Sequence, residues 1–203
     1  MNPQDLVRLR TEYQHLRREA IEAYRQNLKA DRLLSTLCRC ADVTLAQLLA
    51  LCPLPKGAAL AAVGGYGRGE LYPFSDVDLL ILLERDPDPA EEAALGVLVT
   101  AMWDLGLEPG YSVRTISQCI VEAAGDITVE TSMLEARWIA GSKKLIQTFV
   151  SAMKQHLDPY KFFQAKRAEM QQRHARYQDT PYALEPNCKE SPGGLRDLQV
   201  IMW

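Results

Sequence analysis

The chain has 203 residues, of which 47% are hydrophobic and 24% are charged, and its formal net charge is -3 at pH 7. This composition is typical of a soluble domain with room for part of a second, and it excludes a disordered chain. Because the balance is acidic and no apolar run reaches the roughly 20 residues of a membrane helix, we expect a cytoplasmic protein with no nucleic-acid partner and no membrane partner.

The N-terminal part of the chain is predicted to be helical. Leucine and tyrosine residues at helical spacing predict an amphipathic helix from residue 3 to about 40. A second, short helix fits residues 44–52 and ends before Pro53 and Pro55. We therefore assign residues 1–55 to a helical segment that contributes packing and no chemistry.

A change to short apolar runs predicts a sheet after this segment. Residues 58–63 are predicted to form one strand, and residues 77–83 a second strand that is buried on both faces because its apolar run is continuous. Asp88 and the proline that follows it begin a helix that ends at Gly106. A third strand is predicted over 107–116.

The rest of the chain is predicted to be mainly helical. Ser117 is expected to cap a short helix, and further helices are expected over 126–141, 143–157 and 159–177. A proline-punctuated loop over 179–194 leads to Leu195–Trp203, which stops in mid-pattern without a C-cap. We therefore expect the chain to be a piece of a longer protein, and this last segment to begin a helix whose partner surface is missing.

Two carboxylates stand at the start of the second predicted strand. Residues two apart on a strand point to the same face, so Asp76 and Asp78 lie side by side, about 6 to 7 Å apart along the backbone. Unpaired, they would repel each other, and a hard divalent cation such as Mg2+ removes this conflict. Because Mg2+ is usually held by one or two carboxylates together with substrate phosphates, the pair predicts a metal and a phosphate in one site.

A glycine-rich stretch precedes the two carboxylates and supports a phosphate site. Glycines permit positive φ and a close approach of backbone N–H groups to an anion. Arg68 either adds charge-assisted hydrogen bonds to the same phosphates or bridges to Glu70, and Ser75 either caps the turn or touches phosphate. Glu70 also stands where the P-loop and the dinucleotide fingerprint require other residues, so both of these motifs fit the stretch less well. The glycines are Gly64, Gly65, Gly67 and Gly69.

A family resemblance rests on these residues. Two glycines, ten intervening residues and Asp-Val-Asp resemble the signature of the polymerase-beta-like nucleotidyltransferases. More narrowly, the stretch GGYGRGELYPFSDVDLLILL is similar to the N-terminal domain of the bacterial PII uridylyltransferase/uridylyl-removing enzymes. Three later stretches resemble the same family in the same order: GLEPGYSVRT, DITVETSMLEARWIAG and EPNCKESPGGLRDLQ. The resemblance runs from about residue 10 to the end.

The resemblance implies a fold and an activity. The fold is α/β (α+β), with a nucleotidyltransferase core of a small mixed sheet flanked by helices over 56–141. A helical segment and the start of a truncated helical domain are expected over 142–203. The activity is Mg2+-dependent transfer of UMP from UTP to a tyrosine of the PII signalling protein, with release of pyrophosphate. Asp76 and Asp78 would ligate two Mg2+ ions, Gly64 and Gly65 would contact the phosphates, and Gly67 would belong to the same nucleotide site.

The same family carries further domains and a third carboxylate. Its phosphohydrolase domain, which removes UMP, and its glutamine-sensing domains match nothing here, so we expect both activities to be absent from these residues. Glu108, on the third predicted strand, is the first choice for the third catalytic carboxylate. Ser112 or another position is an alternative for the matching place, with Asp126, Glu130 and Glu135 as outside candidates.

A second cluster near the end of the sequence, Lys189, Gly193, Gly194, Arg196 and Asp197, remains open between two interpretations. It is either a turn and helix cap, or it places Lys189 or Arg196 against the triphosphate or the nucleobase. Arg114 faces either the same cleft or the surface.

Two other functions compete with uridylyl transfer. Another protein nucleotidylyltransferase, such as the glutamine synthetase adenylyltransferase, shares the Gly and Asp-x-Asp pattern, and a preference for UTP over ATP distinguishes the two. A regulatory module that binds nucleotide without turnover is the other alternative. It would bind nucleotide and form no product with PII and Mg2+.

Overall fold

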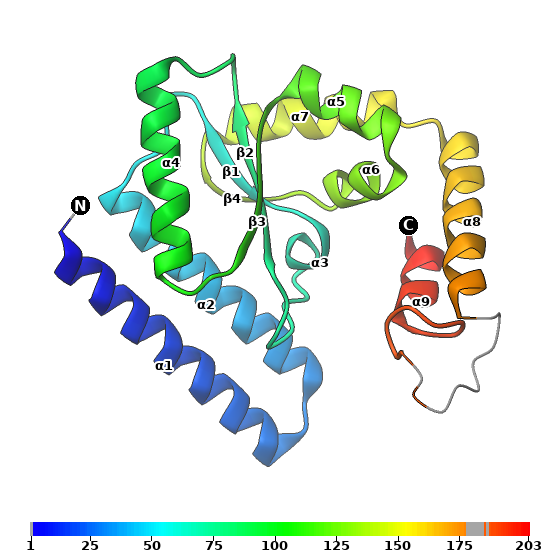
Figure 1. Cartoon of the computed structure of the whole chain (residues 1–203), viewed down its shortest axis with the longest axis horizontal. Helices are drawn as coiled ribbons and strands as arrows, with labels where there is room; N and C mark the ends of the chain where they lie inside the picture. Colours follow the sequence, from blue (N-terminus) through cyan, green and yellow to red (C-terminus); the bar gives the residue numbers. More distant parts are fainter. Residues whose placement is uncertain (1, 178–184, 186) are drawn as a thin grey trace.

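The computed structural model describes residues 2–177, 185 and 187–203. Long helices stand at the N-terminal end of the chain and a pair of helices at its C-terminal end, with a sheet between them (Figure 1). The elements in chain order are α1 (Pro3–Asn27), α2 (Ala30–Leu51), β1 (Ala59–Ala62), α3 (Gly64–Gly67), β2 (Val77–Leu83), α4 (Pro89–Asp104), β3 (Pro109–Thr115), α5 (Ile116–Gly125), α6 (Ile127–Leu134), β4 (Arg137–Gly141), α7 (Lys143–His156), α8 (Pro159–Arg176) and α9 (Leu195–Met202).

Four strands in the described residues form one mixed sheet in the order β3-β2-β1-β4. β2 and β3 run parallel, with Val77 opposite Pro109, and β1 runs antiparallel to both of its neighbours. α4 makes the crossover that a parallel pair of strands requires. The predicted α/β class, with a small mixed sheet flanked by helices, is therefore confirmed.

Helices cover both faces of the sheet (Figure 1). Leu79 and Ile81 of β2 belong to a core shared with α1, α2 and α4, whereas Leu80 and Leu82 belong to a core shared with α5, α6 and α7. Because side chains alternate along a strand, burial on both faces needs apolar residues at every position. The prediction of a doubly buried strand over 77–83 is confirmed.

The helix starts follow local capping chemistry. Asp88 caps α4 in a capping box with Glu91, and the helix ends just before Gly106, as predicted. The prediction that Ser117 caps the next helix is wrong. Thr115 caps α5, because Gln118 three residues later donates its backbone N–H to the threonine hydroxyl and accepts the threonine N–H in return.

The prediction of one helix from residue 3 to about 40 is also wrong. α1 ends at Asn27, where the side-chain oxygen of Asn27 accepts a hydrogen bond from the backbone N–H of Lys29 (2.8 Å) and Leu28 has a left-handed φ of 54°. α2 then runs without interruption through residues 40–44. Asparagine is a known stop signal at a helix end, but the regular apolar spacing on either side conceals it.

By length and mean hydropathy, α2 is the one helix in the described part of the chain that could cross a membrane. Charged residues interrupt the apolar sequence of α2, so this helix agrees with the absence of a continuous apolar run of membrane length. Leu37, Ala41, Leu45 and Leu48 of α2 are fully or almost fully buried in the core with α1 and the sheet. The apolar character of α2 is therefore that of a core helix.

Residues 126–141, which were predicted to be helical throughout, contain a strand. α6 ends at Leu134, and β4 pairs with β1 through an irregular register between Leu60 and Ala61. A five-residue segment is too short for its periodicity to distinguish helix from strand. The free edge of β1 therefore decides its conformation.

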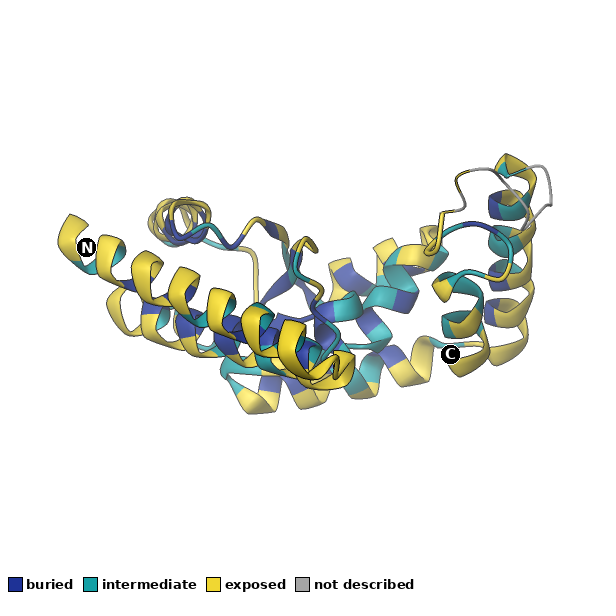
Figure 2. Ribbon diagram, turned by 90° about the horizontal axis from the view of Figure 1, so that it is seen from below, coloured by how far each residue is buried: buried dark blue, intermediate teal, exposed yellow. Residues whose placement is uncertain are grey.

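The helices after residue 142 lie in two places. α7 packs its buried face, centred on Phe149, against the sheet. α8 and α9 lie beyond this core, at the C-terminal end of the molecule (Figures 1 and 2). The boundaries 1–55, 56–141 and 142–203 remain predictions, and the loop predicted over 179–194 lies partly outside the described residues.

The buried Arg173 of α8 joins α8 to the segment that leads into α9. Its guanidinium donates hydrogen bonds to the Asp197 carboxylate (2.7 Å) and to the Glu190 carbonyl oxygen (3.0 Å). Burial alone would raise the pKa of Asp197, but hydrogen bonds from the Gly193 N–H, His174 and Arg173 lower it below the usual value. This carboxylate therefore acts as an ionised tie between the two helices.

The tight contact between β4 and β1 gives a stability prediction. Gly141 has a φ of 79°, and a Cβ there would lie 2.4 Å from the Ala58 carbonyl oxygen. We predict that Gly141→Ala lowers the free energy of unfolding, measured by chemical denaturation, by about 1 to 3 kcal/mol. Gly96→Ala in α4 is the control, because no atom lies within 4 Å of the new Cβ. It should be neutral or slightly stabilising. Equal stability of Gly141→Ala and wild-type protein would contradict this close packing.

Candidate active site

A pocket of about 800 Å³ lies between the sheet and the two C-terminal helices. One wall consists of residues from the segment 64–78 and from α6. The other wall consists of residues from α8, from the segment 188–190 and from α9. The pocket has the size of a small-molecule site.

Asp76 and Asp78 line this pocket. In the described part of the chain, neither carboxylate forms an ion pair or a side-chain hydrogen bond. Burial raises the pKa of Asp78, the charge of Asp76 raises it further, and the charge of Lys189 lowers it. The described residues contain no cluster of three or more metal-ligating side chains. Two neighbouring carboxylates without a cationic partner nevertheless fit a divalent cation, which would relieve their repulsion.

Two glycines leave room for the Asp78 carboxylate. Gly110 stands opposite Asp78 on β3, and a Cβ at Gly110 would lie 2.7 Å from Asp78 Oδ1. A Cβ at Gly64 would lie 3.2 Å from Asp78 Oδ2 and 3.3 Å from Ser132 Oγ, and Gly64 also has a φ of 57°. Side chains at these two positions would displace the carboxylate from the pocket wall.

The glycine-rich stretch forms the short helix α3, which is anchored through the side chain of Tyr66. The hydroxyl of the buried Tyr66 donates a hydrogen bond to Asp42 (2.5 Å), and Arg137 donates two hydrogen bonds to the same carboxylate (2.9 and 3.1 Å). Gly67 does not line the pocket. It packs on Glu135, because a Cβ there would lie 2.2 Å from the Glu135 carbonyl oxygen.

Arg68 lines the pocket and is paired with two carboxylates. One guanidinium nitrogen donates to both oxygens of Glu135 (2.5 and 2.6 Å), and Nε donates to Glu70 (3.1 Å). Of the two interpretations of Arg68, the structure thus provides the bridge to Glu70 and adds a second, stronger bridge to Glu135.

Four further predicted ligands also line the pocket, and the two cations among them differ in their ion pairing. Gly65, Ser75, Lys189 and Arg196 line the pocket with the two aspartates. Lys189 forms no ion pair within the described residues, whereas Arg196 lies 3.5 Å from a Glu190 carboxylate oxygen. In the second sequence cluster, Asp197 ties the helices together, and Lys189 and Arg196 line the pocket. Contact of Lys189 or Arg196 with the triphosphate or the nucleobase stays a prediction.

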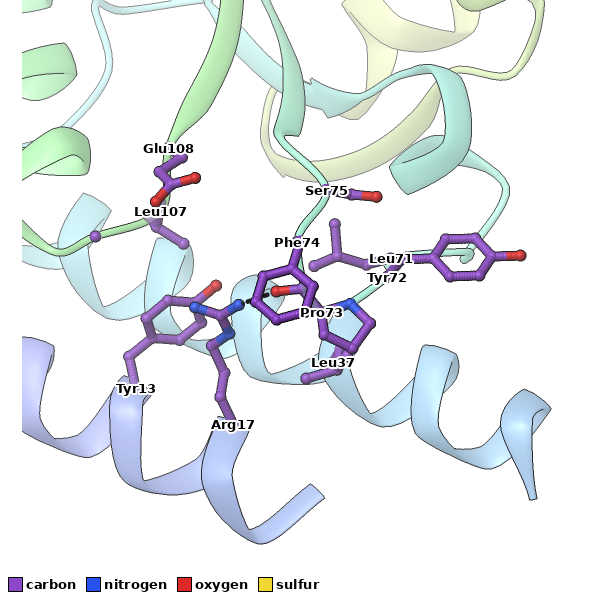
Figure 3. A pocket seen from close by; sticks show the side chains of 11 residues that line it. Tyr13, Arg17, Leu37, Leu71, Tyr72, Pro73, Phe74, Ser75, Leu107 and Glu108 are labelled. Atoms are coloured by element: carbon purple, nitrogen blue, oxygen red, sulfur yellow. Dashed lines mark hydrogen bonds between the residues drawn. The ribbon is translucent and has the colours of Figure 1, made fainter. Parts of the chain in front are cut away.

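Glu108 does not line the pocket that contains the two aspartates. It lines a smaller pocket of about 240 Å³ with Tyr13 and Arg17 of α1 (Figure 3). Its φ of 49° interrupts the alternation of the extended chain just before β3, and the β3 residue opposite Asp78 is Gly110. In this structure Glu108 therefore does not share the pocket of Asp76 and Asp78, and its role as the third carboxylate stays a prediction.

None of the other candidates fills that place either. Ser112 stands opposite Leu80, two residues further along the strands than the pair of Asp78 and Gly110. Asp126 caps α6 by accepting the Thr128 N–H (2.7 Å), and Glu130 does not line the pocket. Glu135 does line it, but its carboxylate binds Arg68. Arg114 pairs with Glu122 (3.4 Å) and does not line the pocket.

Sequence analysis missed several residues of the pocket walls. Thr131 and Ser132 of α6, Lys166 of α8 and Trp203 after α9 all line the pocket. They come from three separate helices, so no short sequence pattern brings them together. For α6 the available signal is a run of hydroxyl residues in an otherwise apolar helix.

The close approach of Gly110 to Asp78 gives a second prediction. A methyl group at Gly110 would force the Asp78 carboxylate to rotate. Because Gly110 is exposed, the same methyl group should not disturb the packing of the core. We predict that Gly110→Ala weakens metal-dependent nucleotide binding at least about tenfold, with little change in melting temperature. Titration calorimetry and thermal denaturation measure the two quantities. Unchanged affinity would show that the Asp78 orientation is not critical.

Two family models match this chain, and the two regions that they match include most residues of the two pocket walls. The family model described as "Nucleotidyltransferase domain" matches residues 46–134, which include the glycines, the aspartates and α6. The model described as "GlnD PII-uridylyltransferase" matches residues 161–203, which include most of α8 and all of α9.

The chain is also similar to full-length proteins named "Bifunctional uridylyltransferase/uridylyl-removing enzyme". It is 64% identical to the protein of Bordetella avium over 203 residues, which is 100% of this chain and 24% of the relative. It is 64% identical to the protein of Bordetella parapertussis over 199 residues (98% of this chain, 23% of the relative). It is 50% identical to that of Ralstonia nicotianae over 202 residues (100% and 23%). The chain spans about a quarter of the length of these curated relatives.

Proposed function

We propose that the chain transfers UMP from UTP to a tyrosine hydroxyl of the PII signalling protein, releasing pyrophosphate, as its similarity to the nucleotidyltransferase and PII-uridylyltransferase models and to the bifunctional uridylyltransferase/uridylyl-removing enzymes suggests. The observation that carries this proposal is the pair of carboxylates, Asp76 and Asp78, without cationic partners among the described residues. They line a pocket to which both matched regions contribute.

Asp76 and Asp78 are the residues that would hold the metal, for which we propose Mg2+. Nucleotidyltransferases generally use a divalent metal, and when bound it neutralises phosphate charge and activates the attacking oxygen in an in-line displacement. Ionised carboxylates accept and do not donate, so this pair offers oxygen ligands only. The absence of side chains at Gly64 and Gly110 leaves room for the Asp78 carboxylate beside the pocket.

Lys189 is the side chain best suited to bind the triphosphate. Its charge reaches Asp78, and it has no carboxylate partner within the described residues. Arg68 and Arg196 line the same pocket but are paired with glutamates, so their charges are already balanced. We therefore assign them secondary roles in nucleotide binding. Gly64 and Gly65 present no side chain to the pocket, which allows phosphate to approach the backbone, and Ser75 lines the same pocket.

A second candidate function is nucleotide binding without turnover. One observation favours it: among the described residues, Asp76 and Asp78 have no third carboxylate beside them. Release of pyrophosphate distinguishes this candidate from the transferase.

We further propose that the reaction takes place in the cytoplasm, without a membrane or nucleic-acid partner. The one helix with membrane-like hydropathy, α2, is buried in the core, and the net charge of -3 offers no track for a nucleic-acid backbone.

A transfer assay tests the proposed function. The protein is incubated with PII, Mg2+ and labelled UTP or ATP, and both labelled PII and pyrophosphate are measured. We expect label from UTP alone, and Asp78→Asn should reduce the rate about a thousandfold or more. Asp104→Asn, an exposed acid at the end of α4, should have no effect. Label from ATP would instead indicate an adenylyltransferase, and binding without pyrophosphate would indicate the second candidate.

The unbalanced charge of Lys189 gives a separate prediction. Lys189→Ala should weaken UTP binding about tenfold, because a charge-assisted contact to phosphate is lost, and it should leave uridine binding unchanged. Arg196→Ala should have a smaller effect, since Glu190 already balances that charge. Equal effects of the two variants in a calorimetric titration would contradict the assignment of Lys189 as the main phosphate ligand.

A further inference from the structure

Trp203 is held at the wall of the pocket by charged groups from three parts of the fold. Its indole N–H donates a hydrogen bond to Glu135 Oε1. The Lys166 ammonium lies 4.3 Å from the centre of its ring, and the Arg68 guanidinium carbon lies 5.7 Å from it. Lys166 comes from α8, Arg68 follows α3, and Glu135 follows α6. One aromatic ring thus joins the C-terminal helices to the glycine-rich turn.

Glu135 holds this turn in two ways. Its carboxylate binds Arg68 through both oxygens, and its backbone carbonyl packs where Gly67 has no side chain. Its side chain is only 8% exposed, so these contacts are shielded from water. Because a shielded ion pair depends strongly on its geometry, a displacement of Glu135 would also displace Arg68 and the turn.

The Glu135 oxygen that accepts the indole N–H also accepts a hydrogen bond from Arg68. Lys166, whose side chain is 5% exposed, pairs with Glu169 on the same helix while it faces the indole ring. Loss of Trp203 would therefore remove a donor from Glu135 and an aromatic face from both cations. The three side chains and the ring form a single connected unit.

We propose that Glu135 and Trp203 are positioning residues that couple the docking of α9 to the conformation of the glycine-rich turn, Gly64–Gly69. Neither residue needs to touch the nucleotide. Trp203 fixes Glu135, Glu135 fixes Arg68 and α3, and the turn is thereby held in the form that lines the pocket. The effect on nucleotide binding rests on the proposed function, whereas the effect on the turn does not.

Hydrogen exchange of the backbone amides in the turn tests this coupling directly. The N–H groups of Gly67, Arg68 and Glu70 donate to backbone carbonyls within the segment 63–65, at 2.9, 3.1 and 2.8 Å, so their exchange reports opening of the turn. Trp203→Phe keeps a ring over Lys166 and removes the N–H donor. We expect it to speed exchange in this segment by about five- to tenfold, and to leave α4 unchanged. Trp203→Ala should have a larger effect.

Trp138→Phe is the matched control. The Trp138 indole N–H also donates to an oxygen, the Gly141 carbonyl (3.3 Å), and Lys143 lies 4.5 Å from its ring centre. Trp138 does not line the pocket. This variant should leave exchange in the turn at the wild-type rate.

Kinetics separate positioning from a general loss of stability. Trp203→Phe and Glu135→Gln should each raise KM for UTP about five- to tenfold with kcat within about twofold. Because both act through one contact, the double variant should be no worse than the more affected single variant. Unchanged amide exchange in the turn of Trp203→Phe, or fully additive effects in the double variant, would overturn the proposal. A wild-type protein that binds no UTP would contradict the proposed function alone, and the exchange measurement would still decide the coupling.

Discussion

The repulsion between Asp76 and Asp78 is the constraint around which the site is arranged. β2 is buried on both faces, so the Asp78 carboxylate begins a strand where water solvates it only partly, beside a second negative charge. Burial and this neighbour together raise its pKa, so its charge is less favourable there than it would be in water. Gly64 and Gly110 nevertheless keep the space around the carboxylate open. Two carboxylates that repel each other and have open space beside them form a site suited to a ligand that supplies positive charge.

The rest of the molecule completes this site from two directions. The sheet and α6 supply the carboxylates and the turn, and α8 and α9 supply Lys189 and the opposite wall. Most positive charges of the pocket are already balanced by glutamates, so its net field is set by few groups, among them Lys189 and the two aspartates. A metal together with a triphosphate would fit such a field, because it brings charges of both signs. The two walls depend on each other through the contact of Glu135 with Trp203.

Local chemistry made much of the fold predictable. The capping residues of α4 and the continuous apolar run of β2 are signals that lie within a few residues of the structures they specify. β4 was missed because its conformation depends on the free edge of β1, which lies about 75 residues earlier. The same limit applies to the site. The aspartates and glycines follow one another in sequence, whereas the positions of Glu108, Glu135 and Trp203 depend on a positive φ and on the packing of distant helices.

Calorimetric titration of UTP with and without Mg2+, into wild-type protein and into the Asp76→Asn, Asp78→Asn double variant, tests the central claim most directly. If the two carboxylates hold a metal that binds the triphosphate, wild-type protein will bind UTP tightly only with Mg2+, and the double variant will lose this dependence. UTP binding of equal strength in both proteins and under both conditions would contradict the claim, because it would show that neither the carboxylates nor a metal contributes to the site.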